Sequence, residues 1–187
     1  RKAEAEDIDS VESIYNKILD NEKATGKVYT NWQKGLYPTR NDAAAALEAG
    51  TLYVGELDGK VAACVNLNHI QPPEYSKISW SVEAEGREVL VIHTLCIPPE
   101  NAGQNLGNQF VTFAEKLAKQ LKRTPIRLDT YEGNIPAASL YRPLGYQYTG
   151  SADFNFQHVI METLICFDQI LERVGKDRPR NVILDVD

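Results

Sequence analysis

Hydrophobic and polar positions follow two different periods along the chain, and the change between them indicates where helices give way to strands. In residues 7–21 the side chains of Ile8, Val11, Ile14 and Ile18 recur at helical spacing, and Gly26 follows them. After residue 50 the spacing is that of strands, with a hairpin turn at 58–59. The same patterns predict a helix over 42–48 capped by Asn41, strands over 51–57, 60–69, 87–97, 125–131, 146–156 and 159–167, and helices over 106–121, 137–144 and 168–174.

The order of these elements predicts an α+β fold. Residues 87–97 form the most continuous apolar strand, so we expect it at the centre of the sheet. A helix and a further strand follow it, which is the order of a parallel crossover. No internal repeat or low-complexity linker is present, so residues 1–167 are expected to form a single domain. Residues 168–187 form a C-terminal extension of unknown role, for which a strand added to a partner and a disordered end are both open.

Charge and cysteine content narrow the functional classes. The formal net charge is −6 at pH 7, the wrong sign for a protein that neutralises many phosphates, so no nucleic-acid partner is expected. An acidic surface would instead attract amines, polyamines or basic peptide segments. The three cysteines form no C-x-x-C pair, which predicts neither a disulfide framework nor a metal site. No signal peptide or membrane helix is recognisable, and we expect a cytoplasmic protein without a membrane partner.

The first candidate for chemistry is the loop over 100–108, between the central strand and the long helix. A helix N-terminus directs free backbone N–H groups outward and so favours anions. Gly103 and Gly107 would let a diphosphate approach the backbone, and Asn105 tolerates the left-handed conformation. Taken alone, the loop is also typical of any strand-to-helix connection. It matches neither a dinucleotide fingerprint nor a P-loop.

A second motif lies after the next strand, where the sequence reads NIPAASLYRPLGY from Asn134 to Tyr146. It resembles the late motif of the GCN5-related N-acetyltransferase (GNAT) family, N-x-x-A-x-x-L-Y-x-x-x-G-F/Y, at every stated position. The family's earlier motif, R/Q-x-x-G-x-G/A, aligns with 102–107. Two positions differ, because Ala102 replaces an Arg or Gln and Asn105 replaces a Gly.

The resemblance implies a mixed, mostly antiparallel sheet of about six to seven strands that is flanked by helices and splayed in the middle. Acetyl-CoA would occupy the gap between the central strand and the strand after the long helix. By the family pattern, the residues that bind it are Leu95, Cys96, Ile97, Ala102, Gly103, Gln104, Asn105, Leu106, Gly107, Asn108, Asn134, Ala137 and Tyr141. The changes at Ala102 and Asn105 are expected to weaken this binding without abolishing it. The thiol of Cys96 is expected to be inert packing.

Direct acetyl transfer needs a neutral amine, donors for the developing oxyanion and an acid near the sulfur. The resemblance gives the role of acid to Tyr141. For the base, His93 is a candidate because Val91, His93, Leu95 and Ile97 are expected to share one face of the central strand. A buried histidine bonded to a backbone carbonyl or a carboxylate is the equal alternative.

Asp129 and Tyr131 are two further candidates at the cleft, because they are expected to share one face of the next strand with Arg127. The alternative is a structural salt bridge of Asp129 with Arg127 or another cation. Aromatic residues expected to line the acceptor pocket are Trp32, Tyr37, Trp80 and Phe154, together with Asp129 and Tyr131.

These features predict an N-acetyltransferase that moves an acetyl group from acetyl-CoA to a primary amine of a small molecule. The alternative is a degenerate acyl-CoA-binding sensor or interaction module. A monomer and a homodimer are both open.

Overall fold

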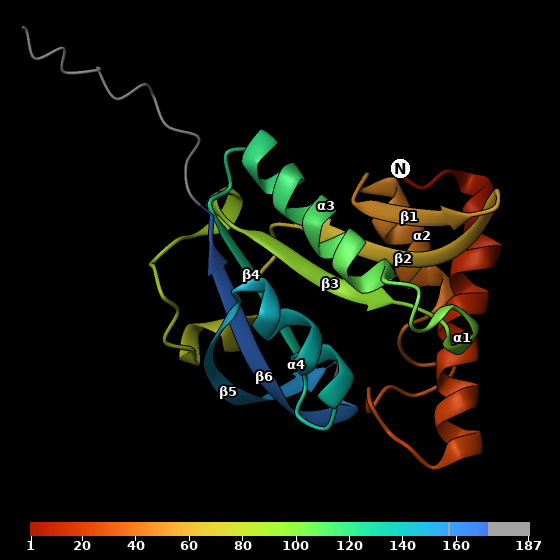
Figure 1. The fold of residues 1–187 in the computed structure, drawn as a ribbon. Helices are drawn as coiled ribbons and strands as arrows, with labels where there is room; N and C mark the ends of the chain where they lie inside the picture. Colours follow the sequence, from red (N-terminus) through yellow and green to blue (C-terminus); the bar gives the residue numbers. More distant parts are fainter. Residues whose placement is uncertain (157, 172–187) are drawn as a thin grey trace, which may run out of the picture.

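The computed structural model describes residues 1–156 and 158–171. Six strands form one sheet in the order β1-β2-β3-β4-β6-β5, in which only the β3–β4 pair is parallel (Figure 1). The strands are β1 (Leu52–Leu57), β2 (Lys60–Asn68), β3 (Leu90–Cys96), β4 (Pro125–Tyr131), β5 (Gln147–Phe156) and β6 (Ile160–Ile170); the α-helices are α1 (Ile8–Thr25), α2 (Arg40–Glu48), α3 (Leu106–Gln120) and α4 (Ile135–Tyr141). The predicted α+β class, with a mostly antiparallel sheet flanked by helices, is confirmed.

Helices cover both faces of the sheet (Figure 1). On one face, α3 and α4 pack on β2, β3, β4 and β6 through a core that includes Ile92, Phe110 and Tyr141. On the other face, α1 and α2 pack on β1, β2 and the end of β3. The short 3-10 helix η2 (Pro73–Lys77) covers the β5–β6 end of that second face, where Tyr75 packs with Phe154.

The central strands separate along their length. β3 pairs with β4 only where Leu90–Ile92 lie beside Ile126–Leu128. Beyond Ile92 the ladder between them ends, although β3 continues to Cys96 and β4 to Tyr131. The predicted splay in the middle of the sheet is therefore present. It leaves the edge of β3 that faces β4 without a strand partner.

A β-bulge bends β3 at the point where the strands separate. Asn66 of β2 pairs with His93, but Cys64 pairs with Cys96, so β3 has one residue more than β2 between the two pairs. Thr94 lies inside this bulge with a φ of 44°. A positive φ is unusual for a β-branched residue, so the backbone at Thr94 is strained.

The bulge reverses the alternation of side chains along β3. Leu95 and Ile97 pack with the same core cluster as Ile92, whereas Val91 packs on the opposite face. The expectation that Val91, His93, Leu95 and Ile97 share one face is therefore wrong, because one inserted residue moves every later side chain to the other face.

Several predicted boundaries also differ. The helix α2 begins at Arg40, two residues earlier than expected, because the backbone N–H and hydroxyl of Thr39 both donate to Asp42; Asn41 is not the cap. β6 continues to Ile170, so the helix predicted over 168–174 is wrong at residues 168–170. There Asp168 is buried and accepts hydrogen bonds from the backbone N–H (2.8 Å) and hydroxyl (2.7 Å) of Ser81. The remainder of that extension, residues 172–187, lies outside the described residues.

Among the helices described, none is both long and apolar enough to cross a membrane.

Candidate active site

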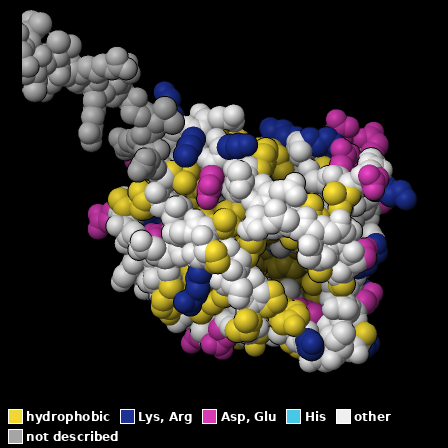
Figure 2. Space-filling model, in the orientation of Figure 1, with side chains coloured by type: hydrophobic (Ala, Val, Ile, Leu, Met, Phe, Trp, Pro, Cys, Tyr) yellow, Lys and Arg dark blue, Asp and Glu magenta, His cyan; other side chains and the backbone are white. Residues whose placement is uncertain are grey.

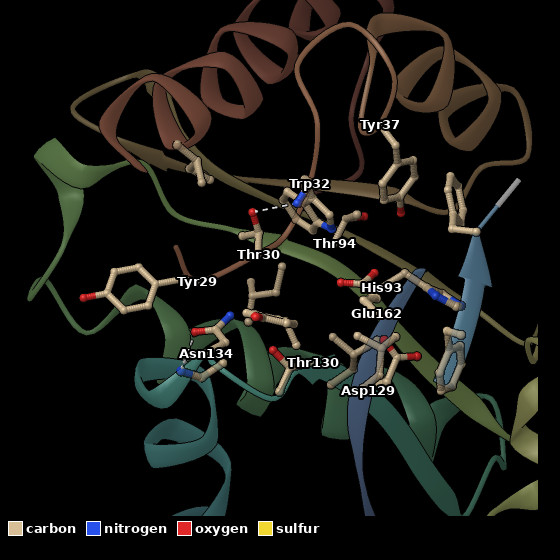
Figure 3. A pocket seen from close by; sticks show the side chains of 18 of the residues that line it. Tyr29, Thr30, Trp32, Tyr37, His93, Thr94, Asp129, Thr130, Asn134 and Glu162 are labelled. Carbon is tan, nitrogen blue, oxygen red and sulfur yellow. Dashed lines mark hydrogen bonds between the residues drawn. The ribbon is translucent and has the colours of Figure 1, made fainter. Parts of the chain in front are cut away.

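A cavity of about 780 Å³ opens where β3 and β4 part. Figure 2 shows a hollow on this face with hydrophobic side chains inside it, and Figure 3 shows the polar side chains on its wall. The cavity brings together eleven of the residues predicted from the sequence: Trp32, Tyr37, His93, Leu95, Ile97, Asp129, Tyr131, Asn134, Ala137, Tyr141 and Phe154.

Tyr141 is the last residue of α4 and is 4% exposed. Its ring packs against Tyr146, with ring centroids 5.5 Å apart, and it lines the cavity. Burial raises the pKa of its hydroxyl, and the negative charge of Asp129 raises it further. The phenol therefore keeps its proton at neutral pH, which is the form that an acid needs.

The loop before α3 has the backbone shape expected of an anion site. Gly103 and Asn105 both adopt positive φ, at 77° and 60°. Asn105 is the N-cap of the 15-residue helix α3, but no side chain caps the backbone N–H groups there. Its side chain accepts a hydrogen bond from Asn108 instead. The first amides of α3 are therefore available to an anionic group. The loop residues Ala102, Gly103, Gln104, Asn105, Leu106, Gly107 and Asn108 do not line the cavity itself.

Gly107 and Asn134 have local structural roles. A side chain at Gly107 would place its Cβ 3.0 Å from Leu140 and 3.6 Å from Ile97, so the glycine allows α4 to pack closely on α3. Asn134 caps α4, where its side-chain oxygen accepts a hydrogen bond of 3.1 Å from the backbone N–H of Ala137.

Besides the loop over 102–108, two predicted site residues, Cys96 and Trp80, do not line the cavity. Cys96 is 1% exposed and lies opposite Cys64 in a hydrophobic core, as expected for an inert thiol. Trp80 packs on Tyr75 and covers the guanidinium group of Arg127, whose central carbon is 4.5 Å from the centre of its ring. Trp80 therefore stabilises the segment around it, and the structure does not bring it into the acceptor pocket.

His93 lies on the cavity wall with one ring nitrogen already engaged. Its Nε2 is 3.0 Å from the side-chain oxygen of Asn68 and 3.1 Å from the carbonyl oxygen of Ile70. Two acceptors assign the ring hydrogen to Nε2 and leave Nδ1 as the free acceptor. Burial lowers the pKa of His93 to about 4, so the ring is neutral at physiological pH. The alternative of a histidine bonded to a backbone carbonyl matches these contacts.

Asp129 belongs to β4 and lines the cavity. Its Oδ2 accepts a hydrogen bond of 2.8 Å from the hydroxyl of Tyr75. Burial raises the pKa of Asp129 to about 6, although the bond from Tyr75 opposes the shift. Arg127 does not form the proposed salt bridge with Asp129, because its guanidinium group donates to Gln71 and to the carbonyl oxygens of Val82 and Ala84.

Three cavity carboxylates were not predicted: Glu74, which lies in η2, and Glu22 and Glu162. Glu162 lies in β6, and burial together with the charge of Asp129 raises its pKa to about 7. Glu22 is 7% exposed and accepts hydrogen bonds from the backbone N–H of Tyr29 and the hydroxyl of Thr30. The sequence contained a signal for Glu22 and for Glu162. Glu22 follows Ile18 by four positions on the apolar face of α1, and Glu162 is the only charge between residues 159 and 167.

A comparison with known protein families shows which family the chain belongs to. The sequence pattern of the Acetyltransferase (GNAT) family matches residues 11–146, which is most of the chain and includes both motifs. The chain belongs to the GNAT family.

Curated GNAT relatives match over part of their lengths. The uncharacterized N-acetyltransferase YesJ of Bacillus subtilis strain 168 is 30% identical over 119 residues, which is 64% of this chain and 64% of YesJ. The spermine/spermidine N(1)-acetyltransferase of the same strain is 35% identical over 63 residues, 33% of this chain and 41% of that enzyme. The matches thus span less than two thirds of these relatives.

Solved GNAT structures share the fold over nearly the whole chain. A GNAT family acetyltransferase from Streptococcus agalactiae 2603 superposes with a TM-score of 0.77 at 24% identity, covering 92% of this chain and 95% of that one. The structure of yncA from Salmonella typhimurium with its cofactor acetyl-CoA superposes with a TM-score of 0.66 at 14% identity, covering 96% of each chain.

The cavity of this GNAT protein is strongly acidic. Four carboxylates line it, and among the described lining residues there is no lysine or arginine: Glu22, Glu74, Asp129 and Glu162. Aromatic rings stand beside them, with the centroids of Tyr37 and Phe156 4.2 Å apart and those of Trp32 and Tyr37 5.9 Å apart. Such a wall favours an organic cation over an anion.

Proposed function

We propose that this protein transfers an acetyl group from acetyl-CoA to a primary amine of a small molecule. The observation that carries the proposal is that the split between β3 and β4 opens directly onto an acidic cavity containing Tyr141 and Asp129. A cavity of this kind suits an amine acceptor, because carboxylates stabilise the ammonium form in which an amine arrives.

The residues present fit acetyl-CoA. The unpaired edge of β3 beyond Ile92 offers backbone groups to an extended amide chain such as pantetheine, in the region of Leu95, Cys96 and Ile97. The uncapped first turn of α3 and the loop over 102–108 suit its diphosphate. Asn134, Ala137 and Tyr141 would complete the contacts from α4. Acetyl-CoA would supply an acetyl group activated as a thioester.

The acid role belongs to Tyr141 in this proposal. Its hydroxyl is buried and protonated, and it lines the same cavity as Asp129. Donating this proton to the departing sulfur would prevent a free thiolate from accumulating. Backbone N–H groups on the free edge of β3 would stabilise the negative charge that develops on the acetyl oxygen.

For the base, the surroundings support Asp129 over His93. A base works best when its pKa is near the working pH. The pKa of His93 is lowered to about 4, whereas that of Asp129 is raised to about 6. His93 then serves to fix the wall, through its bonds to Asn68 and Ile70.

The test is release of free coenzyme A thiol from acetyl-CoA in the presence of a panel of amines, with binding followed by the shift in melting temperature. A ligand that binds only the folded state raises that temperature. Amine-dependent thiol release supports the transferase. Acetyl-CoA binding with no thiol release for any amine favours the sensor. The differences from the family motif at Ala102 and Asn105 support that alternative. The absence of any melting shift with saturating acetyl-CoA refutes both.

A further inference from the structure

Asp129 and Glu162 lie at two different levels of one cavity wall. Asp129 of β4 pairs with Cys166 of β6, and Glu162 is four residues further along β6. Alternate residues of a strand share a face, so Glu162, Leu164 and Cys166 point to the same side. The two backbone positions are four residues apart along β6, and the two carboxylates are close enough for the charge of Asp129 to raise the pKa of Glu162. Both carboxylates line the cavity (Figure 3).

The Asp129 level is where the acetyl transfer would occur. Asp129 lines the cavity together with Tyr141 and His93, and its charge raises the pKa of Tyr141. Tyr75 fixes its orientation with the hydrogen bond of 2.8 Å. An amine nitrogen placed at this level lies between a carboxylate and the buried phenol.

The Glu162 level has an unfilled hydrogen-bonding position. Its Oε2 is buried and, within the part of the chain that the structure describes, has no hydrogen-bond partner. The groups that face this carboxylate are Asn31, which favours its charged form, Asp129, whose negative charge raises its pKa, and the neutral Tyr37, whose own pKa is raised by the charge of Glu162. A buried acceptor of this kind is costly unless a donor occupies it. Aromatic rings beside it, Tyr37 and Phe156, suit a cationic donor.

We propose that the acceptor is a linear diamine or polyamine, with Asp129 receiving the ammonium group that reacts and Glu162 holding a second ammonium group further along the chain. This inference rests on the proposed function and names its substrate class. The absence of lysine and arginine from the described lining argues against an acceptor with a carboxylate or phosphate at its far end. In the described residues no three His, Cys, Asp or Glu side chains are grouped to hold a metal ion.

The proton balance of the step is simple. One proton passes from the reacting ammonium group to the carboxylate of Asp129, which frees the nitrogen lone pair. The new C–N bond forms as the C–S bond breaks, and Tyr141 protonates the sulfur. Once the C–N bond has formed, the nitrogen loses a second proton, which restores Tyr141, and the proton held by Asp129 goes to solvent as the one net proton released. The second ammonium group stays charged against Glu162 throughout.

Three acceptors of one chain length provide the test: butane-1,4-diamine, butylamine and 4-aminobutanoate, whose far ends are cationic, neutral and anionic. We expect kcat/KM to fall at least tenfold from the diamine to butylamine and further to 4-aminobutanoate. Equal values for the diamine and butylamine would overturn the proposal while leaving the acetyltransferase function intact.

Variants of Glu162 test whether this residue produces the preference for the diamine. Glu162→Gln should remove most of the preference for the diamine over butylamine, and Glu162→Asp should retain that preference. Asp153→Asn is the matched control, because Asp153 is an exposed carboxylate of the same β5–β6 hairpin that does not line the cavity. A diamine preference that survives in Glu162→Gln contradicts the assignment.

Binding measurements separate this inference from the proposed function. Calorimetry of butane-1,4-diamine with the wild-type protein, with Glu162→Gln and with Asp153→Asn needs no turnover. If no amine is acetylated but the diamine binds at least tenfold more weakly to Glu162→Gln alone, the two-carboxylate site is still supported. In that case only the proposed acetyl transfer is wrong. If the diamine binds the wild-type protein and Glu162→Gln equally, or does not bind, the inference is wrong.

Discussion

The hydroxyl group of Tyr75 donates a hydrogen bond of 2.8 Å to Oδ2 of Asp129, and so joins the segment between β2 and β3 to the wall of the cavity. Tyr75 lies in η2 and is 3% exposed, while Asp129 belongs to β4. The bond favours the charged carboxylate, against the effect of burial, which raises the pKa of Asp129 to about 6. Tyr75 is therefore placed to tune the proposed base without touching the acceptor's reacting nitrogen.

Replacing Tyr75 with Phe should raise the pKa of Asp129 further. The acidic limb of the pH profile of kcat/KM is expected to move up by about one pH unit, equivalent to about 1.4 kcal/mol. A small loss of stability, about 1 kcal/mol, should accompany it. Steady-state rates between pH 5 and 9 and denaturant unfolding measure the two effects. An acidic limb that does not move would mean that Asp129 is not the group titrating in the profile.

Replacing Tyr141 with Phe should slow acetyl transfer about 100-fold, the size typical of general-acid catalysis. Affinity for acetyl-CoA should change little, because the ring remains. Single-turnover rates and calorimetric binding separate the two. Tyr146→Phe is the control, since the hydroxyl of Tyr146 is buried without a hydrogen-bond partner in the described structure and its ring packs on Tyr141. Equal turnover in the two variants would remove Tyr141 from the acid role.

Replacing His93 with Gln should leave the acidic limb of the pH profile where it is. The amide nitrogen of Gln can donate to Ile70, as the imidazole does, and a histidine whose pKa is lowered to about 4 is already neutral over the range of the assay. The expected result is a modest fall in kcat, less than tenfold, at every pH. Disappearance of the limb in this variant would instead identify His93 as the base.

The cavity carboxylates should make the free enzyme less stable at high pH. The folded protein holds protons on Asp129 and Glu162 up to pKa values of about 6 and about 7, above those of the unfolded chain. Their unfavourable contribution is absent near pH 4 and complete above pH 7. The lowered pKa of His93 has the opposite slope between about 4 and 6.5, so the comparison must be made between variants.

We therefore expect Glu162→Gln to match the wild-type free energy of unfolding at pH 4.5 and to exceed it at pH 8 by about 1 kcal/mol. This is less than the full pKa shift converts to, because the side chain is partly exposed to solvent. Urea unfolding at the two pH values provides the measurement. A Glu162→Gln variant that is less stable at pH 8 would show that the charge is compensated in the free protein.

Sequence patterns predicted the elements whose information is local. The turn at Asp58-Gly59 set the β1–β2 hairpin. The strand over 125–131 was predicted residue for residue as β4, because Pro125 begins it and Gly133 follows soon after its end. The motif around Tyr141 placed α4 beside the split in the sheet. Asn105 was expected to tolerate the left-handed conformation and does adopt it, with a φ of 60°.

Features that depend on partners distant in the sequence were missed. The bulge at Thr94 appears only when residues of β3 are counted against those of β2, so no pattern within β3 reveals it. Trp80 resembled a pocket residue, but its position is fixed by Arg127, 47 residues later. A single charge in an apolar strand, such as Glu162, is equally consistent with a solvated edge until the packing of the loop over 27–39 is known.

The hydrogen bonds made by Arg127 and Asp168 have a consequence for how this protein can evolve. Arg127 and Asp168, from the sheet, hold the segment between β2 and β3 through Gln71, Val82, Ala84 and Ser81. That segment contributes Glu74 to the cavity and Tyr75 to Asp129, yet it has no strand of its own in the sheet. The surfaces proposed for acetyl-CoA come instead from β3, α3 and α4. Substitutions in the segment between β2 and β3 can therefore alter the acceptor preference during evolution. The residues of β3, α3 and α4 proposed to bind acetyl-CoA need not change with them.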